Sequence, residues 1–253
     1  MIEIQVLGPV TIVHEDRRIE MSSTRVRTVL ALLALSWRTP LRFEYLMDEL
    51  WPERSLGNAR NALQASMLRL RRLLEEVTGR PGDELVRTVG GGYLLDVHRD
   101  AVDANRFIDL VERGSQHVER DPELAISLLR QALTLWRGSA LTGVSDGPRC
   151  RAEAARLEER LLSAREDLIT ARLASGECRA VVSELAELSL EHPERERFSE
   201  QLMLALYRSG RQTEALDVFH HARKRLASEL GLEPGRALRE LYQAILVHDK
   251  VLG

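Results

Sequence analysis

Several residue types are scarce in this chain, and each shortage narrows the class of protein. Aromatic residues make up only 4% of the 253 residues, so aliphatic side chains must fill the core. Glycine (16) and proline (8) are few, which favours a mostly helical chain. The two cysteines, Cys150 and Cys178, lie far apart and have no His or Cys at metal-ligand spacing. We therefore expect free thiols in a reducing cytoplasm.

Long apolar runs and a strong net charge are also missing. No run reaches the roughly 18 residues of a membrane span and no basic-plus-apolar leader opens the chain, so we expect neither membrane insertion nor secretion. The formal net charge is −3, and residues 1–100 contain 14 basic and 14 acidic residues, so no global field attracts nucleic acid. No motif pairs a nucleophile with a base or resembles a metal-ligand set. The sequence therefore predicts neither an enzyme nor a bound cofactor.

What the chain does contain is a long amphipathic segment, Asn58 to Val77. Its apolar residues fall on one helical face, and Asn58 and Gly79 are suited to begin and end a helix. The opposite face displays amides, a leucine and arginines: Asn61, Gln64, Ala65, Leu68, Arg69, Arg71 and Arg72. Residues 54–80 contain six arginines and two acids, a local charge of +4. This pattern predicts a helix that lies in a DNA groove; a solvated arginine face on a core helix is the alternative.

The neighbouring segments favour the DNA-binding interpretation. Alternating residues at 2–6 and 10–13, with a third short strand at 17–20, predict a small antiparallel sheet. Helical spacing predicts two further helices at 24–37 and 41–51, and a polar loop then leads to the segment 58–77. The glycine-centred run 85–97 predicts a β-hairpin. A sheet, three helices and a hairpin are the elements of a winged helix-turn-helix, in the same order.

The remainder of the chain predicts a series of helices. They are separated by glycine or proline breaks and span residues 105–118, 122–136, 147–174, 179–190, 193–209, 212–229 and 235–247. Residues 197–235 carry the pattern of a tetratricopeptide repeat, and a looser copy occurs at 123–136. The predicted fold class is mainly α with a small β component. A winged helix-turn-helix domain occupies residues 1–100 and an all-α, tetratricopeptide-like domain occupies residues 101–253, with the junction at 102–104.

Short stretches of the chain resemble known transcription regulators. LW at 50–51, LRLRRLL at 68–74 and RTVGGGY at 87–93 resemble the effector domain of OmpR-type response regulators. IQVLGPV at 4–10, TRVRTVLALLAL at 24–35 and LASELGLEPG at 226–235 resemble the Streptomyces antibiotic regulatory protein (SARP) family of activators. In that family an OmpR-type winged helix precedes a bacterial transcriptional activation domain.

The resemblance implies several partners. They are double-stranded promoter DNA carrying direct repeats, a second protomer in a homodimer on that DNA, and RNA polymerase, through its sigma factor and core subunits. It also implies a cytoplasmic, nucleoid-associated activator of an antibiotic biosynthetic cluster.

Residue chemistry suggests roles for the exposed face of the long helix. Asn61 and Gln64 can pair with adenine edges, Leu68 can meet a thymine methyl group, and Arg69 can reach guanine or a phosphate. Arg71 and Arg72 are suited to phosphates. From the OmpR-type resemblance, Arg69 and Arg71 are the expected helix contacts, and Trp51 is an expected backbone contact.

Further candidate DNA contacts lie outside this helix. Arg25 and Arg27, at the start of the first long helix, either meet a phosphate or remain solvated. In the hairpin we expect Gly91 and Tyr93 to lie close to DNA, with Arg87 as the nearby cation. A phosphate-cradling loop is not expected at these glycines, because a strand rather than a helix follows them.

Two other functions stay open at this stage. The chain is alternatively a protein-interaction module whose helical repeats hold a peptide, without specific DNA reading. This hypothesis stays open because residues 1–100 have no net positive charge that would attract DNA. A ligand-sensing regulator is the third hypothesis, with the repeat domain as its only candidate site.

Overall fold

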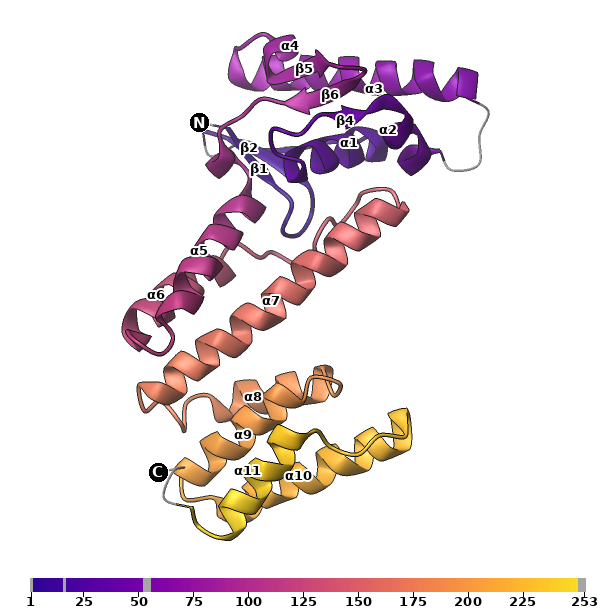
Figure 1. The fold of residues 1–253 in the computed structure, drawn as a ribbon. Coiled ribbons are helices and arrows are strands. Elements are labelled where there is room, and N and C mark those ends of the chain that lie inside the picture. The colour runs from indigo at the N-terminus through magenta and orange to yellow at the C-terminus, as the bar shows by residue number, and fades with distance from the viewer. Residues whose placement is uncertain (1, 16, 52–55, 250–253) are drawn as a thin grey trace. The chain divides into compact units, whose positions relative to one another are not determined.

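The computed structural model describes residues 2–15, 17–51 and 56–249 (Figure 1). The chain divides into two compact units. The first comprises Met1–Glu112 and Gln131–Leu162, and the second comprises Arg113–Arg130 and Ser163–Gly253. The expected helix stop at Pro52, the loop residues 53–55 and the side chain of Asn58 lie outside what the structure describes.

The first unit begins with the predicted three-stranded antiparallel sheet. Its strands, in the order β1-β2-β3, are β1 (Ile2–Gln5), β2 (Thr11–His14) and β3 (Arg17–Glu20). Ile12 lies opposite Ile4 on one neighbour and opposite Ile19 on the other. Ile4 and Ile12 are fully buried, so the alternating pattern placed these side chains on the core face.

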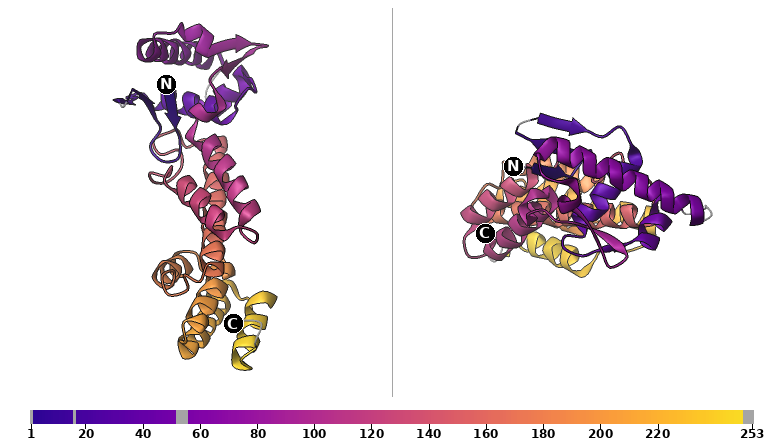
Figure 2. Two further views of the ribbon diagram at one scale, coloured as in Figure 1. Left: turned by 90° about the vertical axis from the view of Figure 1, so that its left-hand side faces the viewer. Right: turned by 90° about the horizontal axis from the view of Figure 1, so that it is seen from above.

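A winged helix-turn-helix follows, as the sequence predicts. Its elements are α1 (Thr24–Leu35), β4 (Leu41–Arg42), α2 (Phe43–Leu50), α3 (Leu56–Thr78), α4 (Gly82–Leu85), β5 (Val86–Val89) and β6 (Gly92–Leu95). The three short strands form a second sheet in the order β4-β6-β5. Both ribbon views show the β5–β6 hairpin lying beside α3 (Figures 1 and 2).

Three features of the winged helix differ from the expectations. Residues 41–42 form a strand instead of the first turn of a helix, because they pair with Tyr93 and Gly92 of β6. The short helix α4 precedes the hairpin and was not predicted. Helix α3 begins at Leu56, so the backbone of Asn58 lies in its first turn and not before it. The expected end is correct, since Gly79 follows Thr78 with a φ of 69°.

Residues 102–104, predicted as a junction between domains, lie in the core of the first unit. They follow the short 3₁₀ turn η1 (Arg99–Ala101), and Asp103 begins α5 (Asp103–His117). The carboxylate of Asp103 is 1% exposed and accepts hydrogen bonds from the Val6 and Leu7 amides at 2.8 and 3.2 Å. It also pairs with Arg137. Burial raises the pKa of Asp103, and the two amides and Arg137 oppose that shift.

Residues 143–150 contact the winged helix as well. Arg27 Nε donates to the Gly143 carbonyl at 2.8 Å, and the Ser145 amide donates to Thr28 Oγ1 at 2.8 Å. The contact ends at the start of α7 (Pro148–Ala174). There the Glu49 carboxylate of α2 accepts the amides of Arg149 and Cys150 at 3.0 and 2.8 Å. The first unit therefore includes a segment that the sequence-based boundary at residue 100 assigned to the second domain.

The second unit is a stack of helices. Beyond parts of α5, α6 (Pro122–Leu133) and α7, it contains α8 (Val182–Glu191), α9 (Glu196–Arg208), α10 (Gln212–Arg225), a π-helical turn (Leu226–Leu230) and α11 (Arg236–Leu246). Helix α9 contacts α8, α10 and α11. The small residues Ala215 and Ala222 are buried where α10 packs, and Gly210 turns the chain with a φ of 80°.

We predict that Glu49→Ala lowers the free energy of unfolding by about 2–3 kcal/mol, because the buried amides of Arg149 and Cys150 lose their acceptor. Glu49 is only 4% exposed, so water does not readily replace the carboxylate. Urea denaturation followed by circular dichroism measures the change. Glu44→Ala, on an exposed position of the same helix, is the control and should shift stability by about 0.5 kcal/mol or less. Equal stability of the two variants would contradict the capping role.

Candidate nucleic-acid interface

One face of α3 is exposed to solvent. Its side chains lie at helical spacing over three turns: Asn61, Gln64, Leu68, Arg69 and Arg72. We call these five residues the α3 stripe. Within the part of the chain that the structure describes, its four polar members make no hydrogen bond or ion pair, and Leu68 is 49% exposed. The stripe can therefore bind a partner without breaking internal contacts.

The opposite face of α3 holds the stripe in place. Leu63, Met67, Leu70 and Leu74 are at most 1% exposed, and α3 packs against α1 and α2. Ser66 is also buried, and its hydroxyl donates a hydrogen bond to the Ala62 carbonyl at 2.9 Å. Because this face is fixed in the core, the stripe has a defined orientation.

Arg71 was predicted to bind phosphate, and the structure gives it internal partners. Its Nε and Nη2 donate to the Val86 carbonyl at 2.8 and 2.7 Å, and Nη2 also reaches Thr88 Oγ1 at 2.9 Å. Val86 and Thr88 belong to β5. The guanidinium therefore ties the hairpin to α3, which leaves fewer of its N–H groups for DNA.

The ring of Tyr93 packs against Phe43 of α2 and lies near Arg71 of α3. Tyr93 is 6% exposed, its ring centroid lies 5.0 Å from that of Phe43, and the Arg71 guanidinium lies 5.8 Å from the ring. Burial raises the pKa of the Tyr93 phenol, and the positive charges of Arg71 and Arg60 oppose that shift. Tyr93 thus supports the hairpin from within and offers little surface to a partner.

The turn of the hairpin is exposed but has little free positive charge. Gly90 and Gly91 adopt φ values of 55° and 79°, which favour glycine, and a side chain at either position would meet no other atom. The Gly91 carbonyl accepts the Phe43 amide at 3.1 Å. Arg87, the predicted cation of the wing, forms an exposed ion pair with Asp96 at 3.0 Å.

The predicted contacts on α1 and α2 divide into two kinds. Arg25 is exposed and its guanidinium lies 5.1 Å from the centroid of the Trp51 ring. Trp51 itself is 7% exposed. Arg27 is occupied internally, because it donates to the carbonyls of Gly143 and Met21 and to Thr24 Oγ1. Arg25 is the one of these three that remains available to a phosphate.

Two exposed arginines near the interface were not among the predicted contacts. Arg42 lies on β4 opposite Gly92, next to the turn of the hairpin. Arg60 lies on α3 one residue before the stripe, with its guanidinium 5.7 Å from the Phe43 ring. Arg60 belongs to the local excess of arginine at residues 54–80, so the sequence offered a reason to consider it. Nothing in the sequence marked Arg42, because a two-residue strand shows no periodicity.

Comparisons with known proteins place this geometry in a family. Residues 102–246 match the family described as "Bacterial transcriptional activator domain", and residues 16–95 match "Transcriptional regulatory protein, C terminal". The chain is 44% identical to the transcriptional regulator RedD of Streptomyces coelicolor over 99% of its length, covering 72% of RedD. It belongs to the SARP family of transcriptional regulators.

Other SARP-type relatives align over nearly the whole chain. The regulatory protein DnrI of Streptomyces peucetius is 39% identical, with 98% of this chain and 93% of DnrI covered. Among solved structures, Mycobacterium tuberculosis EmbR in complex with a low-affinity phosphopeptide has a TM-score of 0.93 at 30% identity. That match covers 98% of this chain and 65% of the EmbR chain. The matched families and relatives are regulators, not enzymes.

Two absences hold for residues 2–15, 17–51 and 56–249. No helix there is both long and apolar enough to cross a bilayer. No group of three or more His, Cys, Asp or Glu side chains is arranged to hold a metal ion. Cys150 is buried beside Glu49, and burial raises the pKa of its thiol, which suits a packing role.

We predict that Arg71→Ala and Arg71→Lys each lower the free energy of unfolding by about 1–2 kcal/mol, because neither side chain can reproduce the forked bond to Val86. Hydrogen exchange should accelerate at the β5 and β6 amides. Arg72→Ala removes the neighbouring exposed charge and is the control, with a change of about 0.5 kcal/mol or less. Full stability of Arg71→Lys would show that only the positive charge matters.

Proposed function

We propose that this SARP-type regulator is a sequence-specific DNA-binding activator. In this proposal residues 1–100 bind promoter DNA and residues 101–253 act in activation. The observation that carries it is the α3 stripe, which is exposed, unpaired and held rigidly by the opposite face of the helix. Its position as the third helix of a winged helix-turn-helix is the position that enters the major groove in such folds.

The stripe has the chemistry to read base edges. From Asn61 to Arg72 it extends about 16 Å along α3, enough to face about five base pairs. Asn61 and Gln64 carry the amides that pair with adenine, and Leu68 can contact a thymine methyl group. Arg69 suits guanine or a phosphate, and Arg72 a phosphate. Arg25, Arg42 and Arg60 add exposed positive charge for the DNA backbone.

Affinity for a single half-site should be modest. Residues 1–100 have no net charge, the wing cation Arg87 is paired with Asp96, and Arg71 is engaged with β5. We therefore infer that two protomers bind adjacent direct repeats as a homodimer, since linked sites multiply affinity. RNA polymerase alongside would add further contacts, through its sigma factor and core subunits.

The family supports a proposal for the biological setting. The proposed targets are promoters of a secondary-metabolite (antibiotic) cluster, and the proposed location is the nucleoid in the cytoplasm. The competing function is a protein-interaction module without specific DNA reading. Genome-wide footprinting separates the two, because a module without DNA reading leaves no discrete protected sites.

We predict that the double variant Arg69→Ala, Arg72→Ala binds promoter DNA 10- to 100-fold more weakly at about 0.1 M salt. If both arginines contact phosphates, the slope of log affinity against log salt falls by about 1.8. Mobility shift over a salt series measures both quantities. Arg179→Ala with Arg239→Ala removes two exposed charges from the second unit and is the matched control. Unaltered binding by the α3 variant would overturn this interface.

We predict a different effect on DNA binding when the side-chain amides of Asn61 and Gln64 are removed. Asn61→Ala or Gln64→Ala should relax discrimination at one base pair by about 1–3 kcal/mol and leave the salt dependence unchanged. Selection from a randomised operator library, followed by sequencing, shows which position becomes degenerate. Ala65→Ser, on the same exposed face, is the control and should preserve the selected sequence. A uniform loss of affinity across all operators would assign these amides to the DNA backbone.

A further inference from the structure

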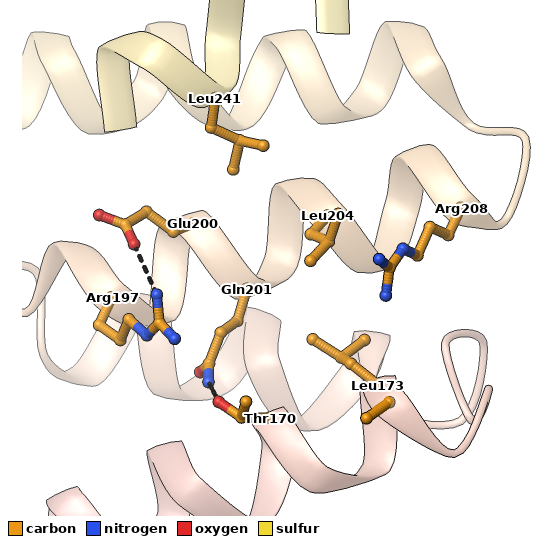
Figure 3. Close-up of a pocket in the computed structure, with 9 residues that line it drawn as sticks. Thr170, Leu173, Arg197, Glu200, Gln201, Leu204, Arg208 and Leu241 are labelled. Atoms are coloured by element: carbon orange, nitrogen blue, oxygen red, sulfur yellow. Dashed lines mark hydrogen bonds and ion pairs between the residues drawn. The ribbon is translucent and has the colours of Figure 1, made fainter. Parts of the chain in front are cut away.

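Two arginines beside the hairpin lack the acidic partner that many other arginines of the chain have. Figure 3 shows such an internal pair on α9, where Arg197 Nη1 lies 3.1 Å from the Glu200 carboxylate. Arg42 and Arg60 are both exposed, and neither guanidinium forms a hydrogen bond or an ion pair with the residues that the structure describes. Their positive charge is therefore available to a partner.

The backbone of Arg42 is fixed at the turn of the hairpin. Arg42 lies opposite Gly92 in the pairing of β4 with β6, and a side chain at Gly92 would collide with the Leu41 carbonyl. Glycine at this position therefore allows the close approach of the two strands. The Gly91 carbonyl accepts the Phe43 amide at 3.1 Å, so the residue after Arg42 is held at the same turn.

Arg60 reaches the same turn from α3. It lies eleven residues, or three helical turns, before Arg71, so the two side chains share one edge of the helix and are about 16 Å apart along its axis. Arg71 binds Val86 at the base of the hairpin, whereas the Arg60 guanidinium lies 5.7 Å from the centroid of the Phe43 ring. The hairpin therefore follows this edge of α3, with its turn at the Arg60 end.

The chemistry of this corner suits an anion. A guanidinium over an aromatic ring keeps its N–H donors for other partners, because they lie in the plane of the group, so Phe43 positions Arg60 without using its donors. Glu44 is the one acid within two positions of Arg42 or Arg60 in the sequence. Arg42, Arg60 and Arg71 contribute three positive charges against this one negative charge, a local sum of +2.

We propose that Arg42 and Arg60 form a phosphate-binding site that holds one strand of the DNA backbone at the turn of the hairpin. The inference rests on the proposed function, since it requires α3 to lie in the major groove. A backbone strand borders that groove on each side, and the edge of α3 that carries Arg60 faces the strand nearest the hairpin. The turn itself has no cation, because residues 90–91 are glycines and Arg87 is in an ion pair. Arg42 and Arg60 supply the missing charge and fix the register of α3 without reading sequence.

Neutralising single phosphates tests the site with the full chain. The probe is a promoter duplex that the natural chain protects in footprinting, synthesised with a neutral methylphosphonate at one phosphate at a time. The double variant Arg42→Ala, Arg60→Ala should bind the unmodified duplex about 10- to 100-fold more weakly at about 0.1 M salt. Neutralising the phosphates at one edge of the protected site should weaken the natural chain but not this variant, because the contact is already lost. Equal sensitivity of the two proteins at every phosphate would overturn the site.

Matched variants separate this site from a loss of fold and from the proposed function. Arg42→Lys with Arg60→Lys keeps both charges and should bind within about threefold of the natural chain. Arg179→Ala with Arg239→Ala removes two exposed charges from the second unit and should bind as the natural chain does. The slope of log affinity against log salt should fall by about 0.9 for each phosphate contact that the alanine variant loses. An unchanged slope would overturn this site alone, whereas a natural chain that protects no duplex would overturn the proposed function as well.

Discussion

Backbone amides held by buried carboxylates are the constraint on which the first unit depends. Asp103 accepts the amides of Val6 and Leu7 where the chain leaves β1, and Glu49 accepts two amides where α7 begins. Both carboxylates are nearly inaccessible to water. Removing either would leave buried donors unpaired, which costs more than the bond itself contributes. These two side chains connect segments that are about 100 residues apart in the sequence.

The Glu49 contact explains why residues 143–150 lie on the winged helix. Gly147 precedes α7, and a side chain there would collide with the Glu49 carboxylate. Glycine is therefore required for the close approach of the two segments. The helix-turn-helix is not an isolated module in this protein, since its second helix carries the cap of a helix that follows about 100 residues later.

Periodicity in the sequence was sufficient for the longer elements but not for the shortest ones or for the contacts between elements. The 3.6-residue pattern of α3 showed which face is buried, and the alternation around Ile4 and Ile12 showed the sheet, because both signals are local. The strand at 41–42 was too short to show a period. On a helical wheel Arg71 lies on the shoulder of the exposed face, as Arg69 does. Its bond to Val86, fifteen residues later, depends on where the hairpin packs, which no local pattern reveals. For the same reason the buried role of Asp103 was not predicted.

The separation of tasks on α3 has a consequence for how this regulator can change over evolution. Its core face and Arg71 maintain the fold, whereas the polar side chains of the α3 stripe make no hydrogen bond or ion pair with the described residues. If the stripe reads DNA as proposed, substitutions in it should alter which operator is recognised at little cost in stability, so new specificities can arise in single steps. On the same proposal, Asn61, Gln64, Leu68 and Arg69 are the positions to randomise when redirecting the protein to a chosen promoter.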